Sequence, residues 1–160
     1  MSTFERDEYL WRETYFVLFP AERRPLLADV VRELRSLPER LVLEQPRADE
    51  QGRFESITVL APADFAAMDI SYEAGESVVE QVASLQKELK RGTVDLAKLA
   101  KLKDCDARLD LMHFEQVSGS DNDDGDIGEM FDPAGMLLVL EALVRLTGGV
   151  GVDPQSGTLL

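Results

Sequence analysis

The sequence has one cysteine and one histidine among its 160 residues. A single cysteine, Cys105, excludes an internal disulfide, and a single histidine, His113, excludes a metal site built from several imidazoles. Cys105 also lies between Asp104 and Asp106, whose negative charges disfavour the thiolate that a catalytic cysteine needs. No G-x-S-x-G motif is present to supply a serine nucleophile. These absences favour a protein that is not an enzyme.

Long hydrophobic runs are also missing. The most apolar stretch, 136–146, is interrupted by Glu141 and Arg145 and is too short to span a bilayer. The first eleven residues are charged where a secretory signal would be apolar. We therefore expect a cytoplasmic protein that does not associate with membranes.

Basic residues are scarce, since 17 Lys and Arg stand against 31 Asp and Glu, for a net charge of −14. A negative field of this size disfavours nucleic acid and favours cations or basic proteins. All five lysines fall within 87–103, where Arg91 adds a sixth positive charge. This segment predicts a solvated helical face. The alternatives are contact with the chain's own acidic segment and a partner-binding surface at Lys98, Lys101 and Lys103.

Carboxylates concentrate in residues 118–132, which hold six acids and no base. With Gly125 at position 6, the segment partly matches an EF-hand calcium loop. It fails at position 1, which is Ser120, and at position 12, where Phe131 cannot ligate a cation. A solvated loop that links the main sheet to the last helix is therefore the first interpretation.

Metal binding is the alternative for this acidic segment. Its carboxylate oxygens are of the kind that calcium and magnesium prefer, and a bound cation could also assist a hydrolysis. A contact with another protein is a third interpretation of the same charge. The candidate metal ligands are Asp121, Asp124, Asp126 and Glu129.

Apolar spacing predicts an alternation of strands and helices along the chain. Residues 14–19 form a continuous aromatic and β-branched run, which is typical of a strand buried on both faces. The other strands are expected at 41–45, 54–60, 65–72 and 108–117. Helices are expected at 25–37, 77–91, 93–102 and 132–147, and the tail from Val150 to Leu160 predicts a hairpin or an edge strand.

This order predicts a single α+β domain over residues 1–160. We expect a mostly antiparallel sheet with helices packed on one face, and a helical extension at the C-terminal end. The first part of the order resembles a split βαβ or ferredoxin-like layout. The resemblance concerns architecture only, and it implies no function because many unrelated functions use such sheets.

The leading functional expectation is a small acidic protein that binds another protein. Trp11 is a candidate contact, because an exposed tryptophan indicates an interface whereas a buried one indicates core. A homo-oligomer formed through a sheet edge or the C-terminal helix is compatible with the pattern. A small-ligand sensor with an apolar pocket between sheet and helices is a further alternative.

Overall fold

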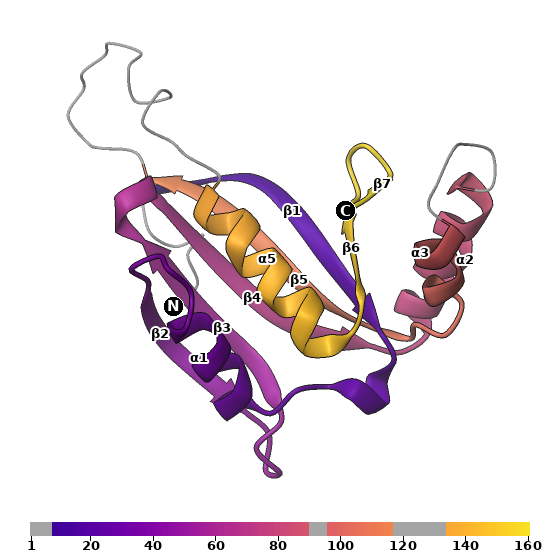
Figure 1. The fold of residues 1–160 in the computed structure, drawn as a ribbon, viewed down its shortest axis with the longest axis horizontal. Coiled ribbons are helices and arrows are strands. Elements are labelled where there is room, and N and C mark those ends of the chain that lie inside the picture. Colours follow the sequence, from indigo (N-terminus) through magenta and orange to yellow (C-terminus); the bar gives the residue numbers. More distant parts are fainter. Residues whose placement is uncertain (1–7, 90–95, 117–133) are drawn as a thin grey trace.

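The computed structural model describes residues 8–89, 96–116 and 134–160. Its strands form one seven-stranded sheet in the order β2-β3-β4-β5-β1-β6-β7, and each neighbouring pair is antiparallel (Figure 1). The strands are β1 (Tyr9–Phe19), β2 (Val42–Ala48), β3 (Phe54–Ala61), β4 (Ala66–Ala74), β5 (Ala107–Gln116), β6 (Val150–Asp153) and β7 (Thr158–Leu159). The prediction of an α+β fold is confirmed, and the sheet is larger than a ferredoxin-like one.

The helices pack on both faces of this sheet. They are α1 (Leu27–Arg35), α2 (Glu76–Leu89), α3 (Leu96–Leu102) and α5 (Ala134–Thr147), with short 3-10 turns η2 (Ala21–Arg23) and η3 (Pro62–Asp64). In the parts of the chain that the structure describes, no helix is long and apolar enough to cross a membrane.

Strand β1 shows why the sheet needs helices on both of its faces. Val17 and Phe19 point into the main core with α1 and α5, whereas Leu18 points to a second cluster with α2 and α3. All three side chains are fully buried, as expected for a strand covered on both faces. The expectation that the helices lie on one face is therefore wrong, because the alternating side chains of β1 need cover on each side.

Helix α5 belongs to the main core and is not an appended extension. Met136, Val139, Leu140 and Leu143 repeat at helical spacing and are buried against the sheet. Figure 1 shows α5 beside α1 on the same face of the sheet. The prediction of a helix here is confirmed, but its role as an extension is wrong, because its apolar side supplies much of the core.

The two edges of the sheet are poor templates for further strands. The β2 edge contains Gln45, whose φ is 51°, followed by Pro46, and its pairing with β3 shifts register near these residues. The other edge is β7, which has two residues. Irregular, proline-bearing or very short edges discourage strand addition.

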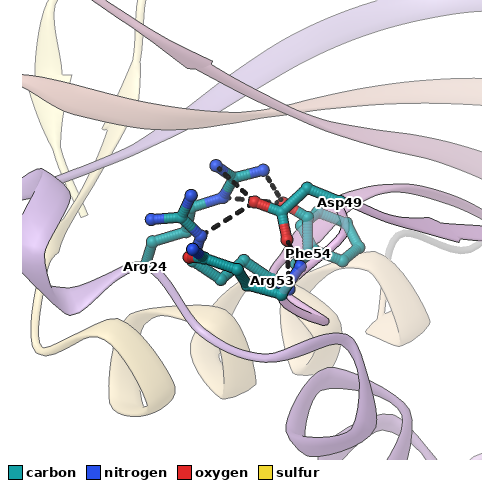
Figure 2. A network of polar contacts seen from close by, with 5 residues as sticks. Arg24, Asp49, Arg53 and Phe54 are labelled. Carbon is teal, nitrogen blue, oxygen red and sulfur yellow. Dashed lines mark hydrogen bonds and ion pairs between the residues drawn. The ribbon is translucent and has the colours of Figure 1, made fainter.

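A polar network fastens the turn after β1 to the β2–β3 hairpin (Figure 2). The side chain of Arg24 donates two hydrogen bonds to the Phe54 carbonyl, at 3.0 and 2.8 Å, and stacks on the Tyr72 ring at 3.9 Å. Asp49 accepts hydrogen bonds from the backbone and the side chain of Arg53. The backbone hydrogen bond is the largest influence that lowers the pKa of Asp49. This network fixes the hairpin on which α1 rests.

Candidate functional site

The candidate site is a groove that runs along α5, and we call it the α5 groove. One wall is α5, and the other includes Leu160, which follows β7, and Lys98 of α3. Its volume is about 870 Å³. The lining residues are Lys98, Ala134, Leu137, Leu138, Leu140, Glu141, Val144, Arg145 and Leu160.

The outward side of α5 is apolar where a surface helix is normally polar. Leu137 is 47% exposed, and Leu138 and Val144 are half-buried. Only Glu141 and Arg145 carry charge in the fourteen residues of this helix. Leu137 and Leu138 therefore extend the apolar surface of α5 beyond its core side, beside the exposed charges of Glu141 and Arg145.

Gly151 brings the second wall of the groove close to α5. A Cβ atom at this position would lie 3.4 Å from the Cβ of Leu160 and 3.5 Å from a methyl of Val144. The backbone amide of Leu160 donates a 2.8 Å hydrogen bond to the Gly151 carbonyl. The exposed Leu160 side chain is therefore held over β6, across from α5.

Cations stand on both walls of the α5 groove. Lys98 is half-buried, and within the described part of the chain no carboxylate lies at ion-pair distance from it. Arg145 is exposed, with its guanidinium 3.5 Å from a carboxylate oxygen of Glu33. Glu141 is the one acid in the lining. The groove is thus apolar along its length, with two cations and one anion around it.

A buried polar cluster lies at the N-terminal end of α5. His113 is fully buried with Nδ1 3.5 Å from Oε1 of Glu13, and the Tyr15 hydroxyl donates to the same oxygen at 3.0 Å. Burial is the main influence that lowers the pKa of His113 and raises that of Tyr15 to about 12. Asp64 accepts a 3.0 Å hydrogen bond from the backbone amide of Gly135. The hydrogen bond to Asp64 therefore holds the start of α5, while His113 is shielded from solvent.

A small polar depression lies on the sheet face opposite α5. Thr58 donates a 3.0 Å hydrogen bond to Asp69, and Ser56, Ser71 and Arg47 complete the polar part of its lining. Its volume is about 280 Å³, near the lower end of the range for ligand pockets. The depression is smaller and more polar than the α5 groove, so we regard the α5 groove as the stronger candidate.

The predicted interaction residues separate in the structure. Trp11 is exposed on β1, where its Nε1 donates to the Thr14 hydroxyl at 3.0 Å. Lys98 lines the α5 groove, whereas Lys101 and Lys103 are exposed and do not line it. Only Lys98 therefore belongs to the groove, and Trp11 is an exposed aromatic elsewhere.

The predicted metal ligands Asp121, Asp124, Asp126 and Glu129 lie outside the described residues, as does the whole of segment 118–132. Among the residues that are described, no group of three or more histidines, cysteines or acids is arranged to hold a metal ion. The calcium or magnesium interpretation therefore stays a prediction.

Sequence reasoning missed the lining leucines of the groove. The adjacent pair Leu137 and Leu138 makes α5 apolar over more than one side. The wide apolar surface of α5 could have indicated a second contact, because a helix that packs on one sheet needs only a single apolar stripe. Leu160 carried no local signal, since its place opposite α5 depends on the β6–β7 turn.

Comparisons with protein-family profiles, with curated proteins and with solved structures find no match to this chain. No activity, ligand or partner is therefore transferred from another protein.

Proposed function

We propose that this protein is a non-enzymatic binding domain that receives an amphipathic helix of another protein in the α5 groove. The observation that carries the proposal is the apolar outward side of α5, which faces Leu160 across the groove. Recognition of this kind places the apolar face of a helix into a hydrophobic groove, with contacts at i, i+3, i+4 and i+7.

A partner helix would pack beside α5, on the side away from α1. Seven strands spaced at about 4.8 Å span about 29 Å, and packed helices lie about 8–10 Å apart. Helix α1 contacts β2 and β3, and α5 contacts β1 and β6. A further helix beside α5 would therefore lie at the β7 edge of the sheet, where it would cover Leu137 and Leu160.

Addition of a partner strand is the less favourable alternative. Such addition needs a regular open edge, and the β2 edge is irregular at Gln45 and Pro46 while β7 has two residues. The geometry therefore favours a helix in the groove over a strand at the edge. The same reasoning disfavours a homo-oligomer formed through the sheet edges.

The exposed apolar surface is large enough for a measurable affinity. Full burial of one leucine side chain contributes about 1.5–3 kcal/mol, and Leu137, Leu138 and Leu160 would each gain part of this. Association opposes the gain with a loss of translational and side-chain freedom. We expect a dissociation constant of about 1–100 µM for a single helical peptide.

The test is the binding of a synthetic 18-residue amphipathic peptide with a leucine stripe and glutamine flanks, measured by fluorescence anisotropy. Leu137→Glu should weaken binding at least about tenfold, because it places a charge in the apolar groove. Val79→Glu is the matched control. Val79 is 49% exposed and, like Leu137, is the fourth residue of its helix, but it lies on α2 outside the groove.

Two results would contradict this proposal. One is equal affinity of the peptide for the parent protein and the Leu137→Glu variant while circular dichroism shows both to be folded. The other is equal binding of a peptide with the same composition but a scrambled stripe. A loss of binding in Val79→Glu as large as in Leu137→Glu would move the site away from the α5 groove.

A small apolar ligand is the second candidate occupant. The volume of about 870 Å³ lies in the range of ligand pockets. A small ligand in the groove would compete with the peptide and would be displaced by it. Competition by alkyl alcohols of increasing chain length, in the same anisotropy assay, distinguishes this candidate, because a helix-specific groove should respond only weakly to them.

A further inference from the structure

The charge around the α5 groove differs from that of the chain as a whole. The complete sequence carries −14, whereas the lining of the groove has Lys98 and Arg145 against the single acid Glu141. A uniform acidic surface would select a basic partner by its long-range field. Because Arg145 already lies 3.5 Å from Glu33, Lys98 is the cation that sets the groove apart from this acidic background.

Lys98 is the informative cation of this pair. Its side chain is half-buried on the α3 wall of the groove, and in the described residues it has no acid at ion-pair distance. A partly desolvated ammonium group is stabilised when a carboxylate approaches it. Arg145 is less decisive, because a partner's carboxylate would compete with Glu33, which already lies 3.5 Å away.

We infer that the helix that occupies the α5 groove carries acidic residues beside its apolar stripe, and that one carboxylate pairs with Lys98. This inference rests on the proposed function, because it concerns the chemistry of the same occupant. The apolar stripe covers Leu137 and Leu160, and the acidic flank lies along the α3 wall. Selectivity then comes from contact pairs in the groove and not from the net charge of the protein.

The salt concentration distinguishes the long-range repulsion by the acidic protein from the ion pair at Lys98. The Debye length falls from about 10 Å at 0.1 M to about 3 Å at 1 M salt. The repulsion between an acidic peptide and the whole acidic protein therefore weakens strongly as salt is added. A partly buried ion pair at Lys98 is screened much less, so the preference for acidic flanks should be clearest at high salt.

The test uses three synthetic peptides that share one leucine stripe and differ only in flanks of glutamate, glutamine or lysine. At 0.5 M salt we expect the glutamate peptide to bind about three- to tenfold more tightly than the lysine peptide. Lys98→Glu should reverse this order. Lys101→Glu is the control, because Lys101 is exposed on the same helix but does not line the groove.

The outcomes separate the inference from the proposed function. If all three peptides bind alike at high salt and Lys98→Glu changes none of them, the inference is overturned while helix binding stands. A preference for the lysine peptide at every salt concentration also overturns it, and would assign selectivity to the net charge. If no peptide binds, or if all bind Leu137→Glu as well as the parent protein, the proposed function fails and the inference fails with it.

Discussion

Helices α1 and α5 lie side by side on one face of the sheet, yet their outward sides differ. The outward side of α1 exposes Arg32 and Arg35, whereas that of α5 exposes Leu137 beside Glu141 and Arg145. Each helix also borders a groove. The groove beside α1 combines Arg32, Arg35 and Ser36 with the apolar residues Leu27, Ala28, Val31 and Pro46. The groove beside α5 combines Lys98, Glu141 and Arg145 with four leucines, Val144 and Ala134.

This difference shows that burial against the sheet does not explain all the apolar residues of α5. Both helices use their inward residues to cover the same core. The outward side of α1 is charged and is solvated by water without a further partner. The outward side of α5 includes additional apolar residues. These additional apolar residues of α5 are the basis of the proposed helix binding, and the following predictions test whether the fold needs them.

The largest expected effect separates the two sides of α5. Leu143 is fully buried, so Leu143→Ala should lower the free energy of unfolding by about 2–5 kcal/mol through lost burial and a residual cavity. Leu137→Ala should change it by less than about 0.5 kcal/mol, because the side chain is exposed. Urea denaturation of both variants measures this difference. A similar loss for Leu137→Ala would show that Leu137 serves the fold and leaves no surplus for binding.

A smaller effect on the free energy of unfolding is expected for Arg24, which precedes α1, and for Arg32, which lies within it. The side chain of Arg24 is 14% exposed, whereas that of Arg32 is 76% exposed. Arg24→Met should cost about 1–3 kcal/mol, because the buried Phe54 carbonyl loses its two side-chain hydrogen bonds. Arg32→Met should cost about 0–1 kcal/mol, since its pair with Asp29 is exposed. Equal losses in urea denaturation would refute the structural role of the network around Asp49.

The smallest expected effect concerns the polar cluster below the start of α5. Burial lowers the pKa of His113, and the charges of Glu13 and Asp64 partly oppose this shift while Arg12 adds to it. The unfolded chain therefore binds more protons than the folded one once the pH drops below about 6.5. The contribution of His113 to stability is present above this pH, and it should fall as the pH decreases toward the folded-state pKa.

Unfolding free energies of the parent protein and His113→Gln, measured from pH 7.5 to 5, test this sign. The variant should have the shallower slope, because glutamine does not titrate. A parent protein that gains stability over the same range relative to the variant would show that His113 is charged in the folded state, with Glu13 outweighing burial.

Local patterns in the sequence predicted most of the elements correctly. Prolines, glycines and helical or alternating spacing placed α1, α2, β3, β4 and β5 close to their observed bounds. The continuous apolar run in β1 also indicated a strand that is buried on both faces. The prediction of helices on one face only did not take this into account. The arrangement of elements was harder, because no local pattern says which strands pair or that α5 would enter the main core.

The candidate site was predictable only in part. Lys98 was among the proposed contact residues, but the charge pattern did not distinguish it from Lys101 and Lys103. The distinction among the three lysines depends on tertiary structure, since Lys98 is the one that lines the groove with Leu160 and α5. Gly151 lies in the tail for which a hairpin or an edge strand was predicted, and its place between the walls of the groove follows from the sheet.

The most direct test of the central claim is a methyl NMR titration of the leucine-labelled protein with the amphipathic peptide. Leu26, which precedes α1, is exposed to nearly the same extent as Leu137 and provides an internal control. We predict that the methyl signals of Leu137, Leu138 and Leu160 shift together while those of Leu26 stay in place. Shifts at Leu26 without shifts along α5 would contradict the account and place the binding surface elsewhere.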